Sequence, residues 1–269
     1  MSNAVKIEPP KKEREFADPQ SSTKSGASGF AETFLRRFKN LGHLALILPV
    51  YGVACVVMGS AAAPGFWMFN FIQSFAESSS GPLYYFLSGV GFVAGYFTYG
   101  FSLIFLIPAL NFIIRGYLKP WRGPYYSLEA IRWYLHNGIT YAVRYTFLEF
   151  ITPTPFNLLF YRMMGMKIGK GTNINSTWIS DASLITMGDK VTIGGSAAIV
   201  GHYGQAGYLI LAPVTIGDGA TIGLKATIMG GVTIGANARI LPNSVVLPKT
   251  QILDGETWGG VPARKLDIV

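Results

Sequence analysis

Cysteine, histidine and charged residues are all scarce in this sequence. Only 13% of its 269 residues are charged, and it contains three histidines and a single cysteine, Cys55. One cysteine excludes an intrachain disulfide and any metal site built from cysteine thiolates. Three histidines leave few candidates for a side chain that exchanges protons near neutral pH.

Positive charge is missing from a long central stretch. No Lys or Arg lies between Asn40 and Arg115, and Glu77 is the only acid there. Two apolar runs, near 44–75 and 83–114, exceed the roughly 20 residues that cross a bilayer. We therefore predict a membrane hairpin of two spans. A re-entrant hairpin stays open because prolines interrupt both runs, and so does a buried core hairpin of a soluble protein.

The net charge of +8 flanks this apolar stretch. Residues 1–40 carry eight Lys/Arg against five Asp/Glu, residues 115–170 carry eight against two, and residues 171–269 carry six of each. Basic flanks around an apolar hairpin favour an anionic membrane surface over nucleic acid. They predict an inner (cytoplasmic) membrane protein with both termini in the cytoplasm.

The segments around the hairpin have distinct compositions. The polar residues 1–28 predict a disordered tail. Within the membrane region, 29–166, Phe30 to Asn40 have the pattern of a basic amphipathic helix on a membrane surface. Aromatic residues alternate with arginines over 121–164, which predicts helices lying at the membrane–water interface.

A six-residue period organises the C-terminal part. Large aliphatic residues occupy every sixth position, at Ile210, Ile216, Ile222, Ile228, Ile234, Ile240 and Val246. A period of six suits a three-sided coil of short parallel strands, so we predict a mainly β chain with a β-helix over 167–248 and a C-terminal extension over 249–269. The period slips near Trp178–Leu184, is interrupted at Gly201–Tyr208, and survives weakly at Ile252 and Trp258.

With these repeats, the histidine-bearing loop and the closing Gly-Val-Pro-Ala-Arg at 260–264, the sequence resembles the hexapeptide-repeat acyltransferases. The arrangement with membrane segments also resembles a membrane-anchored subgroup attached to peptide-synthetase-like enzymes. The resemblance implies a left-handed β-helix preceded by α-helical membrane segments. It also implies a homotrimer with active sites between neighbouring subunits and a coenzyme A thioester, acetyl-CoA first among them, as the acyl donor.

Acyl transfer from a thioester needs a base that takes the acceptor's proton, and histidine suits this task. Only His202 lies in the repeat, within its one large interruption. We predict that His202 is the general base and that Asp181 orients it. Asp189 and Glu149 remain alternative partners, and a purely structural role for His202 remains open.

Coenzyme A is anionic, so basic residues near the coils are candidates for binding it. These are Lys225, Lys249, Arg264 and Lys265. The same fold also supports zinc carbonic anhydrases, but those need three histidine ligands per site, and this repeat supplies one. We therefore expect no metal.

The functional prediction is a membrane-anchored acyltransferase. It would move an acetyl or other acyl group from coenzyme A to a hydroxyl or amine of a lipid-linked or amphiphilic acceptor, without nucleic acid as a partner. The alternative is a non-catalytic trimeric scaffold or binding module tethered to the membrane.

Overall fold

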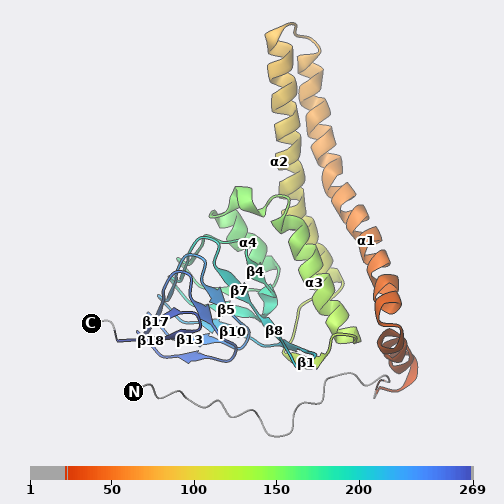
Figure 1. Ribbon diagram of the computed structural model, residues 1–269. Helices are drawn as coiled ribbons and strands as arrows, with labels where there is room; N and C mark the ends of the chain where they lie inside the picture. Colours follow the sequence, from red (N-terminus) through yellow and green to blue (C-terminus); the bar gives the residue numbers. More distant parts are fainter. Residues whose placement is uncertain (1–21, 23, 268–269) are drawn as a thin grey trace.

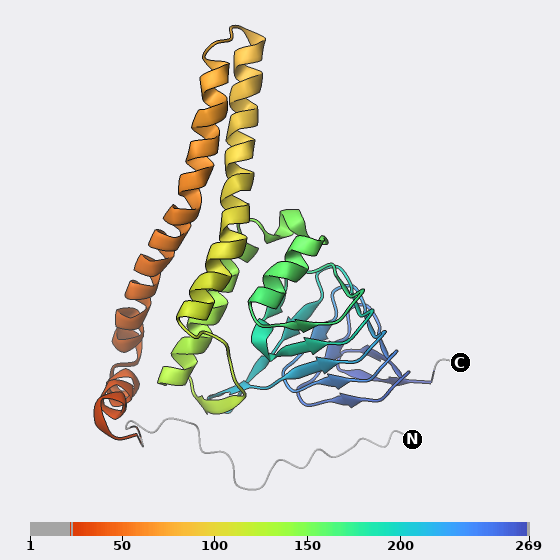
Figure 2. The ribbon, with the colours of Figure 1, turned by 180° about the vertical axis from the view of Figure 1, so that it is seen from behind.

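The computed structural model describes residue 22 and residues 24–267. A long helical hairpin stands beside a three-sided β-helix, and the hairpin extends well past the β-helix at one end (Figure 1). The view from behind shows the same arrangement (Figure 2). The chain is 46% helical and so is not mainly β as predicted, because two very long helices precede the repeats.

The hairpin consists of α1 (Gly26–Ala76) and α2 (Pro82–Ile113). Leu48–Ala76 of α1 and all of α2 are long and apolar enough to cross a membrane. The two helices touch at Gly65 and Gly95, where a Cβ on Gly65 would lie 2.6 Å from the Gly95 carbonyl oxygen. Small residues at this crossing allow the backbones to meet, as is common between membrane helices.

Most of the predicted tail, residues 1–21 and 23, lies outside the described residues, whereas residues 26–28 are helical. The predicted surface helix is the first part of α1, which is interrupted by a non-helical backbone at Lys39.

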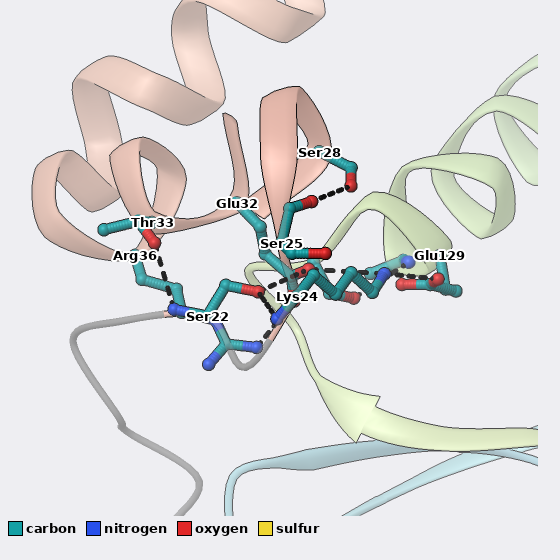
Figure 3. A network of polar contacts seen from close by, with 10 residues as sticks. Ser22, Lys24, Ser25, Ser28, Glu32, Thr33, Arg36 and Glu129 are labelled. Carbon is teal, nitrogen blue, oxygen red and sulfur yellow. Dashed lines mark hydrogen bonds and ion pairs between the residues drawn. The ribbon is translucent and has the colours of Figure 1, made fainter. Parts of the chain in front are cut away.

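A polar network ties the start of α1 to α3 (Leu128–Arg144), as Figure 3 shows. The Lys24 ammonium lies 2.6 Å from the Glu129 carboxylate and 3.3 Å from that of Glu32. Glu32 also pairs with Arg36 at 2.6 Å. The N-terminal ends of α1 and α3 therefore lie together.

The segment 121–164, predicted as interfacial helices, contains a strand as well as helices. Its first residues form β1 (Trp121–Pro124), which pairs antiparallel with β9 (Tyr208–Leu211). Next, α3 packs along α2 with a largely buried face. The 3-10 helix η1 (Leu148–Ile151) and α4 (Pro155–Met163) then lead to the coils. The composition did not indicate that three of its aromatic residues, Phe147, Phe160 and Tyr161, are buried.

Three parallel sheets form the sides of the β-helix. The first contains β2 (Lys167–Ile168), β5 (Ile185–Met187), β10 (Val214–Ile216), β13 (Thr233–Ile234) and β16 (Gln251–Ile252). The second contains β3 (Asn173–Ile174), β6 (Thr192–Ile193), β11 (Thr221–Ile222), β14 (Arg239–Ile240), β17 (Thr257–Gly260) and the antiparallel β18 (Ala263–Leu266). The third contains β4 (Ile179–Ser180), β7 (Ala198–Val200), β12 (Thr227–Ile228) and β15 (Val245–Val246).

The period of six becomes one coil of three strands. Ile216 stacks on Ile234 and Ile234 on Ile252, so the regular coil contains 18 residues. Inward isoleucines fill the interior and are nearly inaccessible to solvent. Because Ile252 and Trp258 lie in β16 and β17, the coils continue past the predicted end at 248.

Ile210 is an exception to the period. It lies in β9 opposite Tyr203 of β8 (His202–Gln205), in an antiparallel hairpin outside the coils. The predicted slip near Trp178–Leu184 is also present, since Ile168 stacks on Met187 and Ile179 on Ile199 rather than at the regular spacing. At the first coil, buried Phe160, Tyr161 and Met164 of the α4 segment join the β-helix core and close its end.

Candidate functional site

The β-helix has three corners, and one of them carries both His202 and Asp181. This corner joins the sheet of β4, β7, β12 and β15 to the sheet of β5, β10, β13 and β16. In the first coil Asp181 turns it, with a left-handed backbone (φ 61°), followed by the 3-10 helix η2 (Ala182–Leu184). In the second coil the corner opens into the hairpin of β8 and β9, which begins at His202.

These two side chains are in direct contact. Nδ1 of His202 lies 2.5 Å from Oδ2 of Asp181. The Asp181 side chain is fully buried, whereas the His202 side chain is 24% exposed. Because a carboxylate accepts hydrogen bonds, Nδ1 carries a proton, so in the neutral imidazole Nε2 has the lone pair. The contact thus orients His202 with a proton acceptor free for a ligand.

Asp181 is held by partners from two parts of the chain. Asn137 of α3 donates its amide Nδ2–H to Oδ1 of Asp181 at 2.8 Å, and the Gly201 backbone N–H donates to Oδ2 at 3.0 Å. The backbone N–H of Asp181 in turn donates to Oδ1 of Asn137 at 3.3 Å. Both carboxylate oxygens are therefore satisfied, which is what a buried charge requires.

The same face of α3 continues these contacts in both directions. The Trp133 ring meets the His202 ring edge to face, with centroids 4.9 Å apart. Near the other end of α3, buried Arg144 donates to the Ile179 carbonyl and to the Ser180 hydroxyl. Sequence reasoning missed Trp133, Asn137 and Arg144. Their spacing of four and seven residues, which places them on one helix face, was the available signal.

The four predicted basic residues do not gather at one place. Lys249 belongs to the corner of His202, because its N–H donates to the Gly230 carbonyl (3.2 Å) and the backbone of Gly230 packs against that of His202. Lys225 turns a different corner, where its N–H donates to the Gly195 carbonyl at 2.9 Å. Both have left-handed backbones, with φ of 54° for Lys225 and 62° for Lys249.

Arg264 and Lys265 lie on β18, at the edge of the second sheet. The Lys265 ammonium is 3.0 Å from the Glu256 carboxylate. Hydrogen bonds from the Leu253 N–H, then from the Trp258 indole and Lys265, lower the pKa of Glu256 to about 2. An anionic ligand would therefore compete with Glu256 for Lys265. Arg264 is exposed, and its guanidinium donates to the Ala263 carbonyl at 3.1 Å.

The remaining predicted partners are elsewhere. The Asp189 carboxylate accepts the Lys170 N–H at 2.7 Å in another corner, and Glu149 accepts the Thr177 hydroxyl at 2.5 Å. His136 is buried against Asn111, with Nδ1 3.1 Å from Oδ1, and burial lowers its pKa to about 4. Across the described residues, no group of three metal-binding side chains of His, Cys, Asp or Glu comes together.

Comparisons with known proteins agree with this coil geometry. A family described as bacterial transferase hexapeptide (six repeats) matches residues 213–248, the regular coils from β10 to β15. No curated protein matches the sequence significantly.

Several solved structures share limited similarity with this chain. One is a hexapeptide-repeat acetyltransferase from Vibrio cholerae O1 biovar eltor complexed with acetyl-coenzyme A, with 25% identity, a TM-score of 0.44, and 57% of this chain and 96% of that one covered. A maltose O-acetyltransferase from Clostridium difficile 630 has 20% identity and a TM-score of 0.44, covering 55% and 92%. A hexapeptide transferase family protein from Anaplasma phagocytophilum has 22% identity and a TM-score of 0.30. That match covers 39% of this chain and only 55% of the other's length.

Proposed function

We propose that this protein is a membrane-anchored acyltransferase that moves an acetyl or other acyl group from coenzyme A to a hydroxyl or amine of a membrane-associated acceptor. The observation that carries the proposal is the pair of His202 and Asp181, 2.5 Å apart in the one interrupted corner of a transferase-type β-helix. A buried carboxylate behind a partly exposed imidazole is the arrangement of an oriented general base.

The proposed transfer accounts for the proton and for the bonds that form and break. Nε2 of His202 takes the proton from the acceptor hydroxyl or amine as its oxygen or nitrogen attacks the thioester carbonyl. The C–S bond then breaks, and the imidazolium returns the proton to the departing thiolate of coenzyme A. Asp181 keeps Nδ1–H pointing away from the substrate and stabilises the transient imidazolium. Cys55 lies on α1, far along the chain from this corner, so we assign no covalent intermediate to it.

The protein acts as a homotrimer, in which the His202 corner of one subunit faces a neighbouring β-helix. Lys249 binds coenzyme A, because it lies in the same corner as His202. Lys225, Arg264 and Lys265 would contact coenzyme A only from other faces of the β-helix. The hairpin sits in the inner (cytoplasmic) membrane, with both termini in the cytoplasm.

The test is calorimetric binding of coenzyme A to detergent-purified protein, for wild type and His202→Ala, combined with acetyl transfer assays. We expect equal affinity in both and loss of transfer in the variant, with its oligomeric state unchanged. If neither protein binds coenzyme A, the donor site is refuted and a non-catalytic scaffold replaces it. Equal transfer by both would refute the role of His202.

A further inference from the structure

Arg144, the last residue of α3, is a buried cation without a carboxylate partner. It is 4% exposed, and none of the ion pairs among the described residues includes it. Two acids that lie against the first coil serve other groups, since Asp181 bonds His202 and Glu149 bonds Thr177. A buried charge is costly unless an opposite charge or a full set of hydrogen bonds compensates it.

The guanidinium of Arg144 retains unused hydrogen-bond donors. Nη2 donates to the Ile179 carbonyl and, at 3.3 Å, to the Ser180 hydroxyl. Nε is buried and has no hydrogen-bond partner. Nη1 bonds no described residue and is not among the enclosed atoms, so it reaches the protein surface. One nitrogen therefore fixes the side chain, and Nη1 remains for an anion.

Aromatic rings frame this guanidinium. Cζ of Arg144 lies 4.5 Å from the centroid of the Tyr141 ring and 5.7 Å from that of Trp178. Trp178 is 47% exposed, so the rings lead from the buried cation to the surface. A solvated arginine extends its head into water, whereas this one is held against β4 (Ile179–Ser180). A guanidinium fixed in this way suits the recognition of phosphate.

Arg144 and Lys249 lie on opposite sides of His202 along the β-helix. Strand β4, which Arg144 bonds, pairs with β7, and β7 ends two residues before His202. Strand β7 in turn pairs with β12, and β12 with β15, which ends three residues before Lys249. A direct transfer needs donor and acceptor on either side of the base. With the donor at Lys249, Arg144 marks the acceptor's side.

The Arg144 end of α3 is also the end nearer to the hairpin tip. Phe147, three residues later, packs against Gly100 of α2, whereas His136 bonds Asn111, farther along α2 from the tip. Figure 1 shows the same order, with β8 beside the end of α3 away from the tip. Arg144 is therefore closer than the proposed base to the membrane-crossing part of the hairpin, where a lipid anchor resides.

We propose that Arg144 binds the phosphate of a lipid-linked acceptor and so holds the acceptor's hydroxyl or amine at Nε2 of His202. This inference rests on the proposed function. Neighbouring strands lie about 4.8 Å apart and each residue advances about 3.4 Å, so Ser180, which Arg144 bonds, is within about 10 Å of His202. The acceptor class is thus an anionic lipid with a compact headgroup between its phosphate and its reacting group.

Fluorine NMR of 5-fluorotryptophan tests the site without a known acceptor, because Trp178 lies beside the guanidinium. The chain has five tryptophans, and Trp178→Phe identifies the resonance of this one. The detergent-purified full-length protein is titrated with dihexanoyl phosphatidic acid, and uncharged dihexanoylglycerol is the comparison. We expect a saturable shift with phosphatidic acid alone. Arg144→Gln should weaken binding by about tenfold or more, since a charged hydrogen bond is lost.

Arg162→Gln is the matched control. Arg162 also donates to backbone carbonyls of the first coil, those of Ile168 at 3.2 Å and Gly169 at 3.4 Å, but from an exposed position. This variant should bind phosphatidic acid like the wild type, which excludes a general effect of positive charge.

The remaining outcomes separate the lipid from other sources of phosphate. An equal shift with inorganic phosphate at the same concentration would refute the lipid assignment, and displacement of phosphatidic acid by coenzyme A would assign Arg144 to the donor instead. An unmoved Trp178 resonance in the wild type overturns the site even where Arg144→Gln does not fold. Calorimetry with coenzyme A keeps the two proposals distinct: absent donor binding with an intact Trp178 shift refutes the transferase function and leaves the phosphate site.

Discussion

The isoleucines from Ile216 to Ile240 at every sixth position of the β-helix are at most 2% exposed, whereas Phe86 and Phe92 of the hairpin are 65% and 72% exposed. Both regions are apolar in sequence. In the β-helix, the apolar side chains at these positions point into a shared interior, so burial drives folding in water. In the hairpin, a few apolar side chains such as Leu103, Ile104 and Ile107 join the protein core, whereas many others face outward, as is typical of membrane helices. The amount of apolar sequence therefore does not distinguish a protein core from a lipid-facing surface. The spacing at which the apolar residues recur does.

The largest expected effect concerns the site, which combines residues from both regions. Asp181→Asn removes the charge that orients His202 and stabilises its protonated form, so we expect the rate of acyl transfer to fall by about 10²–10⁴. Asp189→Asn, in another corner of the β-helix, serves as the matched control and should retain full activity. Steady-state kinetics of both variants give the comparison. Equal losses in the two would mean that corner stability, rather than the His202 contact, limits the rate.

A matched pair of truncations tests the contrast in burial directly. Ile228→Ala leaves a cavity in the β-helix interior, where Ile228 is fully buried, and should cost about 2–5 kcal/mol of unfolding free energy. Phe86→Ala removes a larger side chain from the exposed hairpin surface and should change β-helix unfolding in detergent by less than about 0.5 kcal/mol. Chemical denaturation followed by circular dichroism measures both. Similar losses would contradict the assignment of Phe86 to a lipid-facing surface.

Acid should weaken the contact between α3 and α2 of the hairpin, where His136 bonds Asn111. Burial holds the pKa of His136 at about 4, partly offset by nearby Asp181, against an ordinary 6.5. The unfolded chain therefore binds a proton below pH 6.5 that the folded chain does not bind until about pH 4. Stability is full above pH 6.5 and falls as the pH drops toward 4, by up to about tenfold in the folding constant per pH unit.

The measurement is thermal unfolding at several pH values for wild type and His136→Gln. The amide of glutamine can still bond Asn111 but does not titrate. The variant should show a shallower loss between pH 6.5 and 4, and an unchanged slope would rule out His136 as the source.

The smallest effect tests whether the helical region assists the β-helical site. Asn137→Ala removes the amide that donates to Asp181, and we expect kcat to fall about tenfold with the KM for the acyl donor unchanged, since one hydrogen bond to a charged group is lost. Tyr141→Phe is the control, because it keeps the ring that contacts Arg144 and removes only a hydroxyl 3.4 Å from the Ser180 hydroxyl, and it should have near-normal kcat. A parallel rise in KM would point to general disruption of the site.

Much of the β-helix could be predicted because each coil repeats the same local rule. Ile216, Ile222 and Ile228 are six residues apart, and each is the inward residue of a successive side. Ile210 shows where the rule fails. It keeps the spacing but lies in the antiparallel hairpin, because an insertion can match a period without entering the stack.

The candidate site was predictable only in part. His202 stood out as the one histidine within the interruption, and Asp181 was the preferred partner. Asn137 and Trp133 could not be found in this way, because they belong to a helix whose aromatic and basic residues have the composition of a membrane interface. Asn137 is 44 positions from Asp181 in the chain, and nothing local links the two.

By itself, the sequence determined the three-sided coil, the apolar hairpin and the choice of His202, because each depends on spacing or composition within a short stretch. Only the tertiary structure decided that α3 seats Asn137 on Asp181 and Trp133 on His202, that Lys249 shares their corner while Lys225 does not, and that this corner lies far from the hairpin tip. The physical reason is that helix packing and coil stacking set these distances, and both bring together residues that are remote along the chain.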